Sequence, residues 1–242
     1  MDYGHALLAF SGLALLLTIT PGLDMALVLR SALTQGRVHA AVTGLGICTG
    51  ALIWGLAAAV GIAALIAASD LAYTVLKVAG AAYLIWLGVA MIRATLGRAA
   101  EEPDPVTDML EQIPADPEER AALAERAGLA GREDGAAPVR TERPSRGFVR
   151  GFATNMLNPK VGVFYLAVLP QFMAQGVPAW LMGLSLAGVH VGLTLLFFAV
   201  LITAAHAFRR FLSGPRAAAW IDRVTGTALL VFGVVLLLEG SH

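Results

Sequence analysis

Charged residues are scarce in this sequence, and their scarcity excludes most soluble architectures. Asp, Glu, Lys and Arg make up 14% of the 242 residues, whereas apolar residues make up 57%. A typical soluble domain carries about 25% charged residues. No charged side chain occurs in the 32 residues between Arg37 and Asp70, or in the 48 between Lys160 and Arg209. Because about 20 helical residues cross a bilayer, these runs predict membrane-spanning helices.

Cysteine is almost absent, and so are the common catalytic motifs. Cys48 is the one cysteine, so a single chain can form no disulfide, paired-thiol relay or cysteine-rich metal site. The sequence contains no HExxH motif, and its acids and nucleophiles form no recognisable catalytic set. The N-terminus lacks the basic region of a cleavable signal peptide, so we expect the first segment to stay as a span. We predict a protein that is not an enzyme and has no cofactor, metal or nucleic-acid partner.

The apolar segments predict an all-α polytopic membrane protein. A backbone exposed to lipid must satisfy its own hydrogen bonds, which a helix does within one segment. We predict six transmembrane helices, at about 5–32, 40–67, 71–95, 148–174, 179–207 and 220–238.

A hydrophilic segment divides these six helices into three plus three. The predicted units are a first transmembrane half at 1–96, an acidic cytoplasmic linker at 97–146, and a second transmembrane half at 147–242. The linker holds twelve of the seventeen acids, and we expect it to be solvated, with a short exposed helix possible at 117–129. Lys and Arg gather in the first, third and fifth connections, which predicts that these face the cytoplasm and that both termini face outside.

Two Pro-containing elements interrupt the first helix of each half. Thr20-Pro21 and Asn158-Pro159 each place a capping residue before a proline, which is the pattern of a helix start. Because the two helices cross in opposite directions, the halves have inverted topology, and inverted repeats with discontinuous helices at Pro21 and Pro159 are typical of secondary transporters. The alternative is that the prolines kink the helices for packing alone. Small residues at GxxxG spacing, in 46–50, 147–151 and 188–192, favour close helix packing, either within one protomer or between protomers.

Three separated stretches resemble one family of membrane proteins. "TPGLDMALVLRSALTQGR", "LKVAGAAYLIWLGVAMIR" and "GFATNMLNPKVGVFYLAVLPQF" are similar to the lysine-exporter and homoserine–threonine-efflux family of bacterial amino-acid exporters. The resemblance covers the chain except for the acidic linker. One departure is Leu23, which stands where the family has a second proline.

The resemblance implies export of an amino acid or derivative across the bacterial inner membrane, driven by the proton gradient. We expect a neutral substrate, such as a homoserine-like, threonine-like or branched-chain amino acid, and allow for a homodimer. The alternative is an exporter of a cation or another small metabolite with the same architecture.

The residues themselves suggest how a zwitterion could be held near the middle of the membrane. Lys160 and the N–H groups at the two helix starts are suited to a carboxylate, and Asp24 to an ammonium group. Asp24 has a rival role as the site of proton coupling, and His190 is a second proton candidate. Alternatively, Asp24 only stabilises a helix start and Lys160 reaches towards the headgroups. The predicted substrate-binding residues are Thr20, Pro21, Gly22, Asp24, Asn155, Asn158, Pro159 and Lys160.

Overall fold

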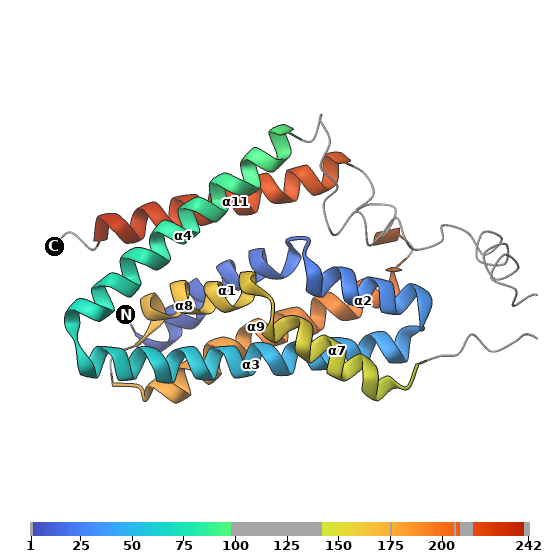
Figure 1. The fold of residues 1–242 in the computed structure, drawn as a ribbon, viewed down its shortest axis with the longest axis horizontal. Coiled ribbons are helices and arrows are strands. Elements are labelled where there is room, and N and C mark those ends of the chain that lie inside the picture. The colour runs from blue at the N-terminus through green and yellow to red at the C-terminus, as the bar shows by residue number, and fades with distance from the viewer. Residues whose placement is uncertain (1, 98–141, 175, 206, 209–214, 240–242) are drawn as a thin grey trace, which may run out of the picture.

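The computed structural model describes residues 2–97, 142–174, 176–205, 207–208 and 215–239. All the regular structure in these ranges is helical (Figure 1). The predicted helix at 117–129 lies outside the described residues. The described elements are α1 (Tyr3–Ile19), α2 (Leu23–Thr34), α3 (Arg37–Ala68), α4 (Asp70–Gly97), α7 (Pro144–Met156), α8 (Pro159–Val168), the 3-10 helix η1 (Leu169–Phe172), α9 (Ala179–Thr203) and α11 (Pro215–Glu239).

Several of these helices are long and apolar enough to cross a membrane. Among the described residues, Arg37–Leu65, Thr74–Leu96 and Ala179–Thr203 meet this condition singly. The pair α1 and α2 meets it together, with a bend of 54° between the two helices. The prediction of an all-α membrane protein is thus confirmed, with three spans or, if the bent pair is one span, four.

The break between α1 and α2 follows from Pro21, although not as the sequence predicted. Thr20 was expected to cap the second helix, but its backbone N–H bonds to the Leu16 carbonyl at 3.1 Å and so ends the first. The Thr20 hydroxyl also lies 2.5 Å from that carbonyl. Thr20 is extended, with ψ 124°, because a residue before proline avoids the helical conformation. Pro21 lies between the helices, and Gly22 is the N-cap of α2 without a side-chain hydrogen bond. The prediction that Thr20 caps and Pro21 opens a helix was therefore wrong.

The second break has the predicted capping. Asn158 is the N-cap of α8, and its side-chain oxygen accepts the Lys160 backbone N–H at 3.1 Å. Pro159 occupies the first helical turn, where its missing N–H costs no hydrogen bond. Trp54 of α3 covers this break, because its indole N–H donates to the Asn155 carbonyl at 3.3 Å while its ring packs against Gly162.

Helix α3 contacts both α7 and α9 through glycines (Figure 1). A Cβ on Gly46 would lie 2.1 Å from the Phe148 carbonyl oxygen, and one on Gly151 equally close to the Thr43 carbonyl oxygen. The close helix packing predicted at 46–50 and 147–151 is therefore confirmed, and the two patterns lie against each other. The pattern at 188–192 does not pack in this way, because no described atom lies within 4 Å of a Cβ on Gly188 or Gly192 apart from their own helix and neighbours.

Helices α4 and α11 form a second pair, which lies side by side along one edge of the molecule in Figure 1. The seam between them is again made of glycines. A Cβ on Gly88 would lie 2.4 Å from the Gly226 carbonyl oxygen, and one on Gly233 would lie 2.8 Å from the Ala81 carbonyl oxygen. Helix α8 packs between this pair and α3, so the second break lies where the two groups of helices meet.

Candidate functional site

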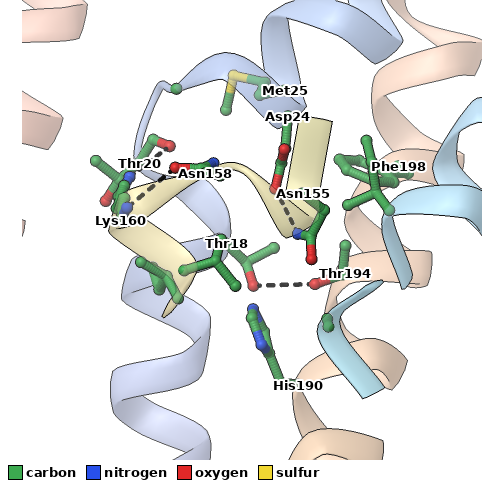
Figure 2. A pocket seen from close by; sticks show the side chains of 15 residues that line it. Thr18, Thr20, Asp24, Met25, Asn155, Asn158, Lys160, His190, Thr194 and Phe198 are labelled. Atoms are coloured by element: carbon green, nitrogen blue, oxygen red, sulfur yellow. Dashed lines mark hydrogen bonds between the residues drawn. The ribbon is translucent and has the colours of Figure 1, made fainter. Parts of the chain in front are cut away.

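The two helix breaks face one another across a cavity of about 50 Å³ (Figure 2). On a measure where a single water requires about 10–15 Å³, this is room for a few water molecules. Six of the eight predicted binding residues line the cavity, and so does His190. Pro21 and Pro159 are not among the lining residues and act through the backbone they shape. The lining consists of Leu17, Thr18, Thr20, Gly22, Asp24, Met25, Ile47, Ala51, Asn155, Asn158, Lys160, Val161, His190, Thr194 and Phe198.

The basic side of the cavity is formed by Lys160 and the start of α2. The Lys160 ammonium group donates to the Thr20 carbonyl at 3.4 Å, and a Cβ on Gly22 would lie 3.6 Å from it. The first N–H groups of α2 have no capping side chain, so this helix start carries partial positive charge near the ammonium group, and Asp24 lies in the same first turn. At α8 the Lys160 N–H is already bonded to Asn158. The prediction that both helix starts offer N–H groups is therefore corrected to α2 alone.

The acidic side is formed by Asp24 and Asn155, which come from different halves of the chain. The Asn155 amide N–H donates to one Asp24 carboxylate oxygen (Oδ2) at 2.8 Å. The other carboxylate oxygen of Asp24 and the amide oxygen of Asn155 are both buried, without a hydrogen-bond partner among the described residues. The Asn158 side chain also interacts with the Asp24 carboxylate. Buried acceptors normally have partners, so the two oxygens are available to the donor groups of a ligand.

Close packing fixes the position of Asn155. Its side chain is 2% exposed, and it lies directly against α3 at Gly50. A Cβ at Gly50 would lie 2.6 Å from the Asn155 amide oxygen and 3.0 Å from its Cβ. Gly50 therefore leaves the space that lets Asn155 reach Asp24.

A third group of polar side chains lies on α1, α8 and α9, and sequence reasoning missed most of it. The Thr18 and Thr194 hydroxyls are 3.4 Å apart, and the Tyr165 hydroxyl lies 2.9 Å from Nδ1 of His190. Only His190 was predicted. The sequence signal for Thr194 was its position four residues after His190 on an apolar helix, which places both on one face.

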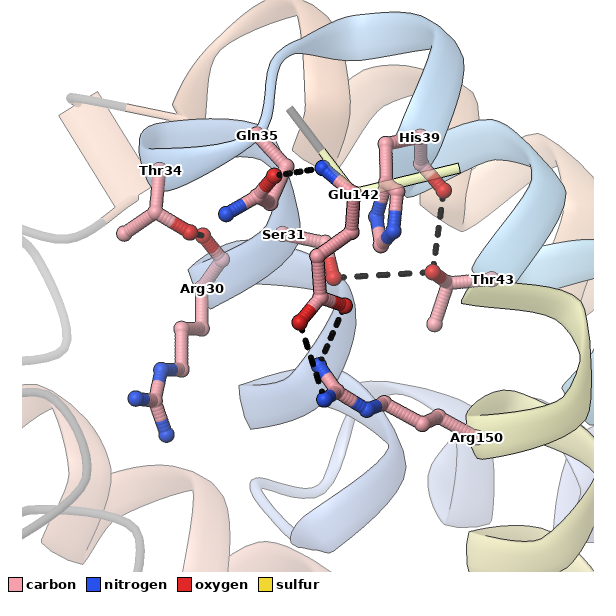
Figure 3. A network of polar contacts seen from close by, with 8 residues as sticks. All are labelled: Arg30, Ser31, Thr34, Gln35, His39, Thr43, Glu142 and Arg150. Atoms are coloured by element: carbon pink, nitrogen blue, oxygen red, sulfur yellow. Dashed lines mark hydrogen bonds and ion pairs between the residues drawn. The ribbon is translucent and has the colours of Figure 1, made fainter. Parts of the chain in front are cut away.

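A separate polar cluster joins the ends of α2, α3 and α7, the helices that hold the acidic side of the cavity (Figure 3). Arg150 pairs with both carboxylate oxygens of Glu142, at 2.7 and 3.0 Å, and the Glu142 backbone N–H donates to the Gln35 side-chain oxygen at 2.9 Å. His39 is buried beside Gly147, and its ring nitrogens have no hydrogen-bond partner in the described part of the chain. The cluster holds Glu142, two residues before the start of α7, against the turn between α2 and α3.

The cavity lies among helices that are long and apolar enough to cross a membrane, and its lining includes Asp24 and Lys160. Within the described ranges, no three His, Cys, Asp or Glu side chains are grouped so that they could hold a metal ion. The family model of the LysE type translocators matches residues 15–240, and the chain belongs to this family. It is accordingly a transporter and not an enzyme.

Three relatives illustrate the match. The chain is 27% identical to the uncharacterized membrane protein YrhP of Bacillus subtilis, over 95% of this chain and 97% of the relative. It is 25% identical to a threonine efflux protein of Escherichia coli K12, over 91% and 92% of the two chains. It is 26% identical to a homoserine/homoserine lactone efflux protein of Salmonella typhi, over 91% and 90%. No solved structure matches the chain.

Proposed function

We propose that this transporter exports a neutral amino acid, or a close derivative, as a zwitterion held in the cavity between the two helix breaks. The observation that carries the proposal is the pairing of opposite charges across one cavity. The Lys160 ammonium group bonds the Thr20 carbonyl just before α2, the Asp24 carboxylate in the first turn of α2 bonds Asn155, and all four residues line the cavity. The names of the threonine and homoserine relatives support an amino-acid substrate.

The site matches a zwitterion group by group. The substrate carboxylate binds the Lys160 ammonium group and the first N–H groups of α2, where the helix dipole favours an anion. The substrate ammonium group donates to the unpartnered oxygens of Asp24 and Asn155. A cavity of about 50 Å³ has room for a few water molecules but not for an amino acid, so binding requires the walls to separate. The two breaks provide places for that movement, since they join α1 to α2 and α7 to α8 without a continuous helix.

The same break geometry supports the proposed architecture. We place six spans in two inverted halves, with α1–α2 as the first span and α7–α8 as the fourth, in the bacterial inner membrane with both termini outside. Discontinuous helices at matching places in inverted halves are a known arrangement for secondary transporters. In support of the orientation, Arg30, Arg37, Arg146 and Arg150 lie on one side of the proposed spans.

Export is driven by the proton gradient, with Asp24 as the coupling residue. A carboxylate that binds either a proton or the substrate ammonium group, but not both, exchanges one for the other. His190 lines the same cavity and is the second candidate for a proton. Lipid and the amino acid are the partners that this mechanism needs. The two unpartnered oxygens would also suit a cation, and a cation exporter of the same architecture is the competing proposal.

The test is efflux from cells loaded with a panel of amino acids, with and without the protein. Asp24→Asn and Lys160→Ala are expected to abolish export while the protein remains in the membrane. Asp2→Asn is a matched control, because Asp2 is an exposed acid outside the cavity and asparagine also caps a helix. Export of inorganic cations but of no amino acid would favour the competing proposal, and wild-type export by Asp24→Asn would contradict the site.

A further inference from the structure

The polar residues Thr18, Thr194 and His190 line the cavity but are not needed to hold a zwitterion. Figure 2 shows the contact between Thr18 and Thr194 lying between Asn155 and His190. The carboxylate and ammonium sites account for Lys160 and Asp24, so this third side faces whatever the substrate carries beyond its Cα. The cavity lining around these three residues is apolar and includes Leu17, Ala51 and Phe198. Their side chains therefore supply the polar atoms on this side of the cavity.

Among these residues, Thr194 has a hydroxyl group whose hydrogen-bonding capacity is largely unused in the described chain. The Thr18 hydroxyl donates to the Ala14 carbonyl at 2.8 Å, as threonines in helices commonly do, and so uses its single hydrogen within α1. The Thr194 hydroxyl makes no such bond in the described chain, and its contact with Thr18 is long at 3.4 Å. It is 8% exposed, next to the cavity. With the Thr18 hydrogen used by Ala14, the Thr194 hydroxyl is the donor in this weak contact. It can still accept a hydrogen bond from a ligand, and it can donate to one by giving up the contact with Thr18.

His190 is fixed in place beside this pair. The Tyr165 hydroxyl holds Nδ1 at 2.9 Å, and Tyr165 itself is fully buried. The other ring nitrogen is therefore the one left for the cavity, and Figure 2 shows the ring directed at Thr18. The structure thus places a weakly bonded hydroxyl and an oriented imidazole on the same wall, and both can form hydrogen bonds with a ligand hydroxyl group.

We propose that Thr194, supported by Thr18 and His190, forms a subsite that binds a hydroxyl group on the side chain of the exported amino acid. The proposal rests on the proposed function, and it assigns substrate choice to residues distinct from those that hold the zwitterion. A hydroxyl group on a short substrate side chain forms a hydrogen bond with the Thr194 hydroxyl. An apolar side chain of the same shape leaves this hydroxyl without a good partner, and a site built around a hydrogen bond discriminates strongly against such a ligand.

Threonine and valine provide the test, since they have nearly the same shape and differ by the hydroxyl group. The measurement is the initial efflux of each from cells loaded to equal internal concentrations. We expect the wild-type protein to export threonine at least about tenfold faster than valine, the ratio that one net hydrogen bond of about 1.4 kcal/mol supplies. Thr194→Val keeps the volume and removes the hydroxyl, so the ratio should fall towards one. Thr194→Ser restores a hydroxyl and should keep the preference.

The outcomes separate the subsite from the proposed function. If the wild-type protein exports neither threonine nor any other amino acid, the proposed function is wrong, and this inference falls with it. If it exports amino acids but Thr194→Val changes threonine and valine efflux by the same factor, Thr194 has only a structural role and the subsite is refuted. A wild-type protein without preference between the two substrates refutes it as well. Tyr165→Phe releases His190 without removing the ring, and a partial loss of preference in that variant supports the proposed wall.

Discussion

Replacing Gly50 with alanine tests whether the acidic side of the cavity depends on the packing of α3 against α7. The new Cβ would lie 2.6 Å from the Asn155 amide oxygen and 3.0 Å from the Asn155 Cβ. Because the contact reaches Cβ as well as the end of the side chain, a small rotation of the amide does not relieve it. Asn155 is 2% exposed and has little free space, so its side chain must leave the position from which it bonds Asp24.

The size of the effect follows from two contributions. Overpacking a well-filled interior costs about 1–3 kcal/mol of folding stability. Losing the hydrogen bond to the Asp24 carboxylate removes about 1.5–3 kcal/mol from the site, the value for bonds to charged groups. If binding and transport need that carboxylate held in place, export falls by about tenfold to a hundredfold. The loss in transport is thus expected to exceed what a moderately less stable protein shows.

The assay is efflux of the best substrate, normalised to the amount of protein in the membrane, together with thermal unfolding in detergent. Gly61→Ala is the matched control, because Gly61 lies on the same helix and a Cβ there meets nothing within 4 Å. This control should transport normally, and alanine favours a helix over glycine by about 1 kcal/mol. Normal export by a well-folded Gly50→Ala protein would refute the role given to the bond between Asn155 and Asp24.

Three further predictions concern the surroundings of the cavity. Trp54→Phe should lower the free energy of unfolding by about 0.5–1.5 kcal/mol, because it removes the bond to the Asn155 carbonyl at 3.3 Å; an unchanged melting temperature would contradict this. Arg150→Ala should cost less than about 1 kcal/mol in the same measurement, because the Arg150 side chain in its pair with Glu142 is 58% exposed; a loss of several kcal/mol would show that the pair is essential to the fold. A reporter enzyme fused after Gly176 should be active outside the cytoplasm, and activity on the cytoplasmic side would reverse the proposed orientation.

The helices and the cavity followed from the sequence to different extents. Apolar runs set the helix positions, because each run must be long enough to cross the membrane, and the predicted 179–207 corresponds to Ala179–Thr203. The cap at Asn158 was also predictable, since Asn before Pro suits a helix start. At Pro21 the same pattern failed. The Thr20 hydroxyl could either bond to α1 or cap α2, and in the structure it bonds to the Leu16 carbonyl of α1.

What the sequence could not show was which distant residues would meet. Asp24 and Asn155 are 131 positions apart, and nothing local to either indicates that they share a hydrogen bond. The sequence equally could not show that the Thr194 hydroxyl has only a weak contact, because this depends on Thr18 bonding its own helix. Gly50 carried a hint in its GxxxG spacing, yet the spacing cannot say that the facing residue is Asn155. Long-range packing decides these points, and a single sequence contains little information about it.

The central claim is that the cavity binds both charged ends of an amino acid, and competition in proteoliposomes tests it most directly. The measurement is exchange of labelled threonine across the membrane, in the presence of excess analogues that lack either the amino group or the carboxylate. The account predicts that neither analogue competes, whereas unlabelled threonine does, and that Asp24→Asn and Lys160→Ala each abolish the exchange. Equal competition by an analogue that lacks one charged end, or exchange at the wild-type rate in either variant, would contradict it.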